Sequence, residues 1–289
     1  MKDIYDILRE WKKRPAEQFA LATLVRAEGS SYRRPGARML ISQDGTMVGS
    51  LSAGCLEAEV AQHAREVLQT GQPAFISFDT RKRFGCAGKI DIYIEPASRE
   101  FFSQLADDLD ARRSHITVTR FPGGKLVKEI HPRIRLWIIG GGPDNAPLRS
   151  LAKLLGWEVI ALLDPNSLSI EPDEWTAAVV KSHNYGRDFA ALQKLLPLNL
   201  RYVGLIGPRK RRDQLMNHLL DIGVTVNAGF FAPAGLELGA ETPEEIALTI
   251  VAEVQRVFAN GSGESLRERK TAIHALKSFA SNQCRISAR

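Results

Sequence analysis

Apolar residues in the first part of the chain follow two periods, one typical of helices and one of strands. Ile4, Ile7 and Leu8 recur at the spacing of an amphipathic helix. Further on, short apolar runs bounded by turn residues such as Asp44-Gly45 indicate strands. The pattern predicts strands at residues 19–25, 39–41, 47–48, 74–78 and 90–94 and helices at 58–68 and 101–111. Together these elements predict a compact α+β domain over residues 1–112.

The pattern changes after residue 133, where strands and helices alternate as in a parallel α/β sheet. Predicted strands occupy residues 136–139, 158–163, 177–180 and 202–206, and predicted helices 146–155, 189–195, 209–220 and 245–258. The expected fold class is therefore α/β, with the N-terminal α+β domain followed by a Rossmann-like parallel-sheet domain at 133–262. Residues 113–132 are expected as a linker or hairpin, and 263–289 as a basic tail that is disordered or loosely helical.

Charge and cysteine content narrow the setting of the protein. The net charge is +6, but no nucleic-acid motif accompanies it, so a nucleic-acid partner is not expected. No apolar run approaches the ~18 residues that cross a bilayer, and the charged start of the chain is unlike a signal peptide. Three cysteines, an odd number, do not make a disulfide framework. We expect a cytoplasmic protein with no membrane partner.

A glycine turn stands between the first predicted strand and helix of the second domain. Gly140 and Gly142 fit two positions of a dinucleotide fingerprint, and Asp164 ends the next strand, where an acid would meet ribose hydroxyls. Asn145 stands at the third glycine position, and Pro143 removes a backbone donor. Two interpretations stay open, namely an NAD(P) site or a Rossmann-shaped scaffold that holds no nucleotide.

Other polar residues follow predicted strands, at the edge where open α/β sheets bind ligands. His183 with Asp188 fits an acid–base pair, or equally a solvated loop histidine beside a capping aspartate. Gly207 and Arg209 follow a later strand, and the basic run at 209–212 opens a helix. Cations at a helix N-terminus oppose the macrodipole, which favours a nearby anion over a bare solvated face.

Two cysteines of the first domain stand between small residues. Gly54 precedes Cys55, Glu57 follows it, and the second motif reads Gly85-Cys86-Ala87-Gly88. Glycines let backbone N–H groups approach a ligand that a thiol contacts, whereas the alternative is a pair of small buried cysteines. The spacing of these cysteines fits no zinc signature. Glu57 either orients a donor or caps its helix, and capping is the more ordinary role.

Arginines crowd a loop of the same domain. Arg33, Arg34 and Arg38 lie near Ser30 and Gly36, a composition that suits a phosphate or another polyanion. We expect the two thiols and these arginines to converge on one pocket.

Six segments together resemble the XdhC/CoxI family. They read GSSYRRPGARM, SAGCLEAEV and FGCAGKIDIYIEP in the first domain, and SHNYGRDFAAL, YVGLIGPRKRRDQL and APAGLELGAETPEEIALTIVAEV in the second. They follow the family's order, so the first domain looks like an XdhC/CoxI-like α+β domain. The departures fall in the Rossmann half. Asp164-Pro165-Asn166 replaces an Asp-x-Arg sequence, Phe231 replaces a histidine, and Pro143-Asp144 replaces a Gly-His pair.

The resemblance implies a maturation chaperone rather than a turnover enzyme. It implies a protein that binds molybdenum cofactor (molybdopterin), protects it during sulfuration by a cysteine desulfurase, and delivers it to an apo molybdenum hydroxylase of the xanthine dehydrogenase type. It also implies that Cys55 and Cys86 contact the metal or relay sulfur, in a homodimer with the ligand between its domains. The alternatives are an NAD(P)-dependent oxidoreductase and a docking partner with a vestigial ligand site.

Overall fold

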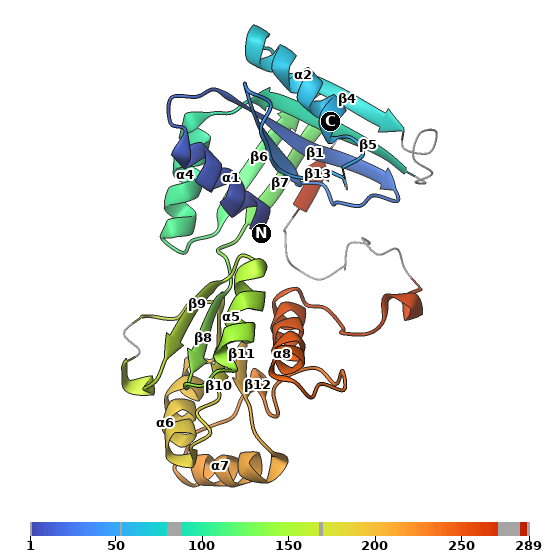
Figure 1. Cartoon of the computed structure of the whole chain (residues 1–289). Coiled ribbons are helices and arrows are strands. Elements are labelled where there is room, and N and C mark those ends of the chain that lie inside the picture. The colour runs from blue at the N-terminus through green and yellow to red at the C-terminus, as the bar shows by residue number, and fades with distance from the viewer. Residues whose placement is uncertain (1, 53, 80–87, 168–169, 271–283, 288–289) are drawn as a thin grey trace. The chain divides into compact units, whose positions relative to one another are not determined.

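The computed structural model describes residues 2–52, 54–79, 88–167, 170–270 and 284–287. The chain divides into two compact units, Met1–Pro132 with Thr271–Arg289 (unit 1) and Arg133–Lys270 (unit 2). Figure 1 shows that each unit has its own sheet and helices.

A five-stranded antiparallel sheet forms the centre of unit 1. Its order is β3-β2-β1-β5-β4. The strands are β1 (Phe19–Gly29), β2 (Arg38–Ser42), β3 (Met47–Gly49), β4 (Ala74–Asp79) and β5 (Gly88–Pro96). The helix α2 (Glu57–Thr70) covers one face with its small apolar side chains, and α1 (Lys2–Lys13) and α4 (Arg99–Asp110) cover the other. Because both faces are covered, β2 and most of β1 are buried on both sides.

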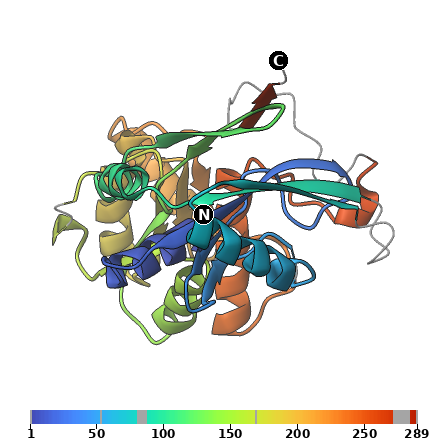
Figure 2. The same cartoon turned by 90° about the horizontal axis from the view of Figure 1, so that it is seen from above.

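Residues 113–132 form an antiparallel hairpin of β6 (His115–Phe121) and β7 (Gly124–Ile130). A strand from the expected tail, β13 (Cys284–Ser287), pairs antiparallel with β7, as Figure 2 shows beside the end of the hairpin. This part of the tail is therefore a strand, which corrects the expectation of a disordered or loosely helical segment. The sheet order β13-β7-β6 leaves β6 at one edge.

The edge strand β6 has an unusual polarity. Thr117 and Thr119 are 3% and 6% exposed, whereas Ile116 and Val118 are 66% and 49% exposed. Successive side chains of a strand point to opposite faces. The hydroxyls therefore face the interior of unit 1 and the larger apolar side chains face outward.

Unit 2 is built on a five-stranded parallel sheet, so the Rossmann-like prediction is confirmed. The strands are β8 (Arg135–Ile139), β9 (Glu158–Leu162), β10 (Thr176–Val180), β11 (Tyr202–Leu205) and the short β12 (Phe230–Phe231), which the sequence pattern did not predict. The helices α5 (Asn145–Leu154) and α8 (Pro243–Phe258) pack on one face. The helices α6 (Tyr185–Leu195) and α7 (Arg209–Asp221) pack on the other (Figure 1).

The strand order β12-β11-β10-β8-β9 determines where the loops of unit 2 meet. With β8 counted as the first strand, the order is 2-1-3-4-5, and the direction of winding reverses between β8 and β10. The loops that follow these two strands therefore meet at the switch point of the sheet. Gly140 has a φ of +125°, and a Cβ added there would lie 2.7 Å from the Lys181 carbonyl group. The glycine thus allows the two loops to touch.

Gly140→Ala is expected to destabilise unit 2 by about 2–4 kcal/mol, because the new Cβ meets backbone atoms and φ is strained. Gly223→Ala is the matched control. Its φ is +81°, but an added Cβ would meet nothing within 4 Å, so only the strain of about 1 kcal/mol remains. Urea unfolding measures both losses, and equal losses would contradict the close approach of the loops.

Candidate functional site

The loop between β3 and α2 carries Cys55, an exposed cysteine that forms no disulfide. Leu51 and Leu56 are each 1% exposed and anchor the loop in the core beside α2. Gly54 and Cys55, which lie between these anchors, are exposed. Gly54 has a φ of +101°, and an added Cβ would meet nothing within 4 Å. The thiol therefore lies on an open apex between two buried anchors.

The carboxylate of Glu57 lies within this loop as a hydrogen-bond acceptor. Its Oε1 accepts from the Ser50 hydroxyl (3.0 Å) and from the N–H groups of Leu51 (3.2 Å) and Ser52 (2.8 Å). Its Oε2 accepts from the Ser52 hydroxyl and from the Leu56 N–H at 3.2 Å. These donors all precede α2, and the N-cap residue Leu56 has no side-chain cap bond. Glu57 therefore orders the loop before the helix rather than capping the helix.

The protonation of Glu57 follows from these bonds. Burial alone would raise the pKa of Glu57, but the hydrogen bonds from Ser52, Ser50 and the backbone outweigh that effect and lower the pKa to about 2. A carboxyl group with a depressed folded-state pKa stabilises the fold above its unfolded-state pKa of 4.5. This contribution is lost as the pH falls through about 2.

The amide protons of Leu51 and Ser52 are expected to titrate with a midpoint of about 2, because both donate to the Glu57 carboxylate. An NMR pH titration of the folded chain measures this midpoint. The Leu56 amide, which donates to the other carboxylate oxygen, is expected to follow the same curve. A midpoint at the ordinary value of 4.5 would contradict the hydrogen-bonded arrangement.

The second cysteine motif lies mostly outside the described residues, because Gly85 and Cys86 fall within 80–87. Gly88 is described and opens β5, where it pairs with Gly29 of β1. A Cβ added to Gly88 would collide with the carbonyl oxygen of Ser30. Ser30 as a residue is exposed. The described end of this motif therefore packs against the end of β1.

Arg38 is buried rather than presented to a ligand. It is 5% exposed, it donates to the Thr117 hydroxyl at 2.8 Å, and its guanidinium lies 5.5 Å from the centre of the Phe101 ring. Burial lowers the pKa of Arg38 to about 10, and the charge of Glu95 partly offsets that effect. These contacts connect β2 with the hairpin and with α4.

The other residues of the expected anion clamp lie in different surroundings. Arg33 is half-buried and forms an ion pair with Asp3 of α1, whereas Arg34 is exposed. Gly36 has a φ of +93°, and an added Cβ would lie 3.1 Å from Lys128 Nζ. The expectation that Arg33, Arg34 and Arg38 together form one clamp is therefore corrected, because Arg38 and Arg33 are held by groups of the protein.

At the switch point of unit 2, a buried ammonium group donates hydrogen bonds to side chains of the glycine turn. Lys181 is 1% exposed and donates to Asp144 Oδ1 and Asn145 Oδ1, both at 2.6 Å. The Asn145 amide in turn donates to the Gly140 carbonyl at 2.9 Å. A Cβ added to Gly142 would lie 2.5 Å from Asp144 Oδ1, so this glycine makes room for the carboxylate. Burial would raise the pKa of Asp144, but Lys181 lowers it below its usual range.

The first three residues of α5 offer no free backbone donor. The Asn145 N–H donates to the Gly142 carbonyl at 3.2 Å, the Ala146 N–H donates to the Pro143 carbonyl at 3.1 Å, and Pro147 has no N–H. A diphosphate held at a helix N-terminus needs such donors. Because a carboxylate already occupies the turn, these residues do not fit the diphosphate of NAD(P).

Asp164, the expected ribose acid, is used within its own loop. Its Oδ1 accepts the Asn166 N–H at 2.8 Å, and its carbonyl accepts the Ser167 hydroxyl at 2.6 Å, so it shapes the short turn Pro165–Ser167. Gly207 follows β11, and Arg209 is an exposed first residue of α7. Neither is among the hydrogen-bond partners of Lys181, which are Asp144 and Asn145.

The structure does not pair His183 with Asp188, and of the alternative it supports the solvated loop histidine but not the capping aspartate. Asp188 is fully buried, accepts the Ser182 N–H at 3.0 Å, and pairs with Arg211 of α7. It is not a cap, because Asn184 caps α6. The side chain of His183 is 60% exposed, with its Nε2 3.7 Å from Asp144 Oδ2. The anion expected beside the basic run at 209–212 is thus supplied by the protein's own Asp188.

Sequence reasoning missed the pairing of Lys181 with Asp144. Each residue follows a predicted strand, which was the available signal. The two lie far apart along the chain, and only the adjacency of β8 and β10 brings them together.

Asp144→Ala is expected to lower the free energy of unfolding by about 2–3 kcal/mol, because it leaves the buried Lys181 ammonium without its counter-charge. Asp144→Ala/Lys181→Met removes both charges and is expected to be more stable than the single variant. Urea unfolding of the two variants and of Lys181→Met completes the cycle. A double variant no more stable than Asp144→Ala would contradict the pairing.

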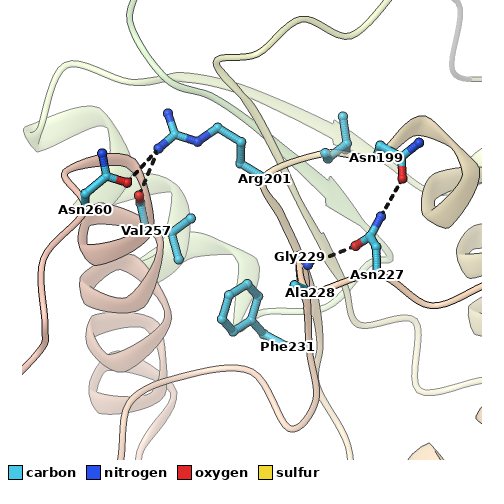
Figure 3. Close-up of a pocket in the computed structure, with 9 residues that line it drawn as sticks. Asn199, Arg201, Asn227, Ala228, Gly229, Phe231, Val257 and Asn260 are labelled. Atoms are coloured by element: carbon cyan, nitrogen blue, oxygen red, sulfur yellow. Dashed lines mark hydrogen bonds between the residues drawn. The ribbon is translucent and has the colours of Figure 1, made fainter. Parts of the chain in front are cut away.

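A shallow pocket of about 450 Å³ lies at the opposite end of the sheet in unit 2. Figure 3 shows Arg201 reaching the Val257 carbonyl (3.0 Å) and the Asn260 side chain (3.3 Å), while Asn227 bonds Asn199 at 2.9 Å. None of the residues expected as ligand contacts lines it. Its polar side chains bond one another, so the pocket adds no chemical group to the candidate site.

Two general features bear on function. Across the described ranges, no group of three or more His, Cys, Asp or Glu side chains is arranged to hold a metal ion. Among the helices that the structure describes, none has both the length and the apolar character to span a bilayer.

The fold and the cysteine loop define a protein with an α+β unit that presents an open thiol and a Rossmann-type unit. Family models match both parts. The XdhC and CoxI family matches residues 13–79, and the XdhC Rossmann domain matches residues 136–254. Together these matches cover more than half of the chain. The chain belongs to the XdhC/CoxI family.

Individual relatives extend this result. The chain is 28% identical to a probable xanthine dehydrogenase subunit of Bacillus subtilis, over 82% of this chain and 92% of that protein. It is 26% identical to the molybdenum cofactor insertion chaperone PaoD of Escherichia coli, over 82% of each. A crystal structure described as a xanthine dehydrogenase from Bacillus halodurans has the same fold, with a TM-score of 0.80 at 24% identity, over 92% of this chain and 98% of that one.

Proposed function

We propose that this protein is a molybdenum-cofactor insertion chaperone that carries the cofactor on unit 1 and delivers it to an apo molybdenum hydroxylase of the xanthine dehydrogenase type. The observation that carries the proposal is the Cys55 loop, in which an exposed thiol lies between two buried anchors, Leu51 and Leu56. The resemblance to PaoD and membership of the XdhC/CoxI family support the choice of cargo.

The chemistry of the loop suits this cargo. Soft metal centres favour thiolate ligands, and Cys55 offers an accessible sulfur. Beside it, the open backbone at Gly54 leaves room for a flat ring system such as a pterin. The exposed guanidinium of Arg34 offers a cation for the cofactor's phosphate. Cys86 would be the second thiol of the site.

The remaining parts of the proposal follow from this role. The chaperone protects the cofactor while a cysteine desulfurase supplies its sulfido ligand, and it then passes the loaded cofactor to the client. A reducing cytoplasm is the setting that keeps an exposed thiol such as Cys55 available. The protein acts as a homodimer. An NAD(P)-dependent oxidoreductase is not favoured, because the turn at Gly142 holds Asp144 where a diphosphate would lie.

Anaerobic purification from a host that makes the cofactor tests this function. The wild-type chain is expected to retain pterin and molybdenum, measured by fluorescence of the oxidised pterin and by elemental analysis. Cys55→Ser is expected to reduce retention by about tenfold, since a hydroxyl is a poor ligand for a soft metal. Cys284→Ser, which lies outside the two glycine-flanked motifs, is the control. Equal retention by wild type and Cys55→Ser, or no retention by wild type, would refute the proposal.

A further inference from the structure

Glu57 contacts the Cys55 loop on both sides of the cysteine. Before the cysteine it accepts from Ser50, Leu51 and Ser52, and after it from Leu56. The carboxylate therefore joins the two arms of the loop beneath the exposed apex. The Ser52 hydroxyl, which itself donates to Glu57, also accepts the Leu56 N–H at 3.3 Å, so the two arms meet at this carboxylate and hydroxyl.

Apolar anchors alone do not fix this geometry. Leu51 and Leu56 set the depth of each arm in the core, and the backbone at Gly49 packs against the Arg38 carbonyl where the loop begins. Hydrophobic contacts are not directional, so they leave the separation and orientation of the arms free to vary. Hydrogen bonds to one carboxylate fix both. Glu57, together with the Ser52 hydroxyl that donates to it, supplies the directional part of the loop's order.

A carboxylate is the side chain that this position requires. Its two oxygens accept several hydrogen bonds at once and donate none. Glutamine would place its NH2 group against one set of these donors. The N–H groups of Leu51 and Ser52 would then lose their acceptor, or the Leu56 N–H would keep only its 3.3 Å bond to the Ser52 hydroxyl.

We propose that Glu57 is a positioning residue for Cys55: by holding both arms of the loop on its carboxylate, it sets where the thiol meets the cofactor. The role goes beyond support of the helix, since the donors Ser50, Leu51, Ser52 and Leu56 precede α2. It rests on the proposed function in that the cofactor is the ligand of Cys55. The order of the loop itself is measurable without any cofactor.

Hydrogen exchange tests the loop directly. In Glu57→Ala the amides of Leu51 and Ser52 are expected to exchange at least about tenfold faster than in wild type, while the amides of β1 keep their protection. The Leu56 amide is expected to change less, because it also donates to the Ser52 hydroxyl at 3.3 Å. Formate is a small carboxylate that fits the vacated acceptor position, and added formate is expected to restore protection in Glu57→Ala. Glu59→Gln is the matched control, because it also removes an acid from the first turn of α2.

The cofactor provides the second measurement. Bound cofactor is expected to leave Glu57→Ala about tenfold faster than wild type, formate is expected to slow that loss, and Glu59→Gln is expected to behave as wild type. Three outcomes would each overturn the proposal. They are unchanged amide exchange in Glu57→Ala, faster exchange that extends to β1 and is not reversed by formate, and cofactor retention by Glu57→Ala equal to that of wild type. Failure of wild type to bind cofactor would refute the proposed function and, with it, the assignment of Glu57 to cofactor positioning, while the exchange data would still report loop order.

Discussion

A hydrogen-bond donor turned away from water needs an acceptor, and both units of this protein supply one from a carboxylate of their own. In unit 1, Glu57 takes the inward donors of a loop and leaves Gly54 and Cys55 facing outward. In unit 2, the Asp144 carboxylate accepts a hydrogen bond from the Lys181 ammonium and fills the space beside Gly142. The same interaction therefore leaves the Cys55 loop open and fills the glycine turn of unit 2.

Much of the fold is predictable from the order of residues, because hydrophobic period is a local property. Every predicted strand and helix overlaps an observed one, including the alternation that identifies unit 2 as Rossmann-like. The elements that were missed depend on distant partners. The strand β12 has only Phe230 and Phe231 and exists by pairing with β11, and β13 exists by pairing with β7 from the other end of the unit. No window of sequence contains those partners.

The candidate site divides in the same way. The Gly54–Glu57 segment can be identified locally, since its glycine, thiol and acid are neighbours in the chain. The arginine clamp could not be judged from its composition. Whether Arg38 faces a ligand or the core depends on how β2 pairs with β1 and on the position of Thr117 of the hairpin, which accepts a hydrogen bond from Arg38. The pairing of Lys181 with Asp144 at the switch point likewise depends on β8 and β10 being neighbours in the sheet, which residue types alone do not reveal.

The polarity of β6 follows from the burial of one guanidinium. Arg38 needs the hydroxyl of Thr117, and alternation along a strand then sends Ile116 and Val118 outward. An edge strand with bare aliphatic side chains is prone to self-association. The tendency of this strand toward self-association in concentrated solution is therefore linked to the interior of unit 1. The link is the alternation of side chains along β6, which follows from the need of the buried Arg38 guanidinium for a hydrogen-bond acceptor.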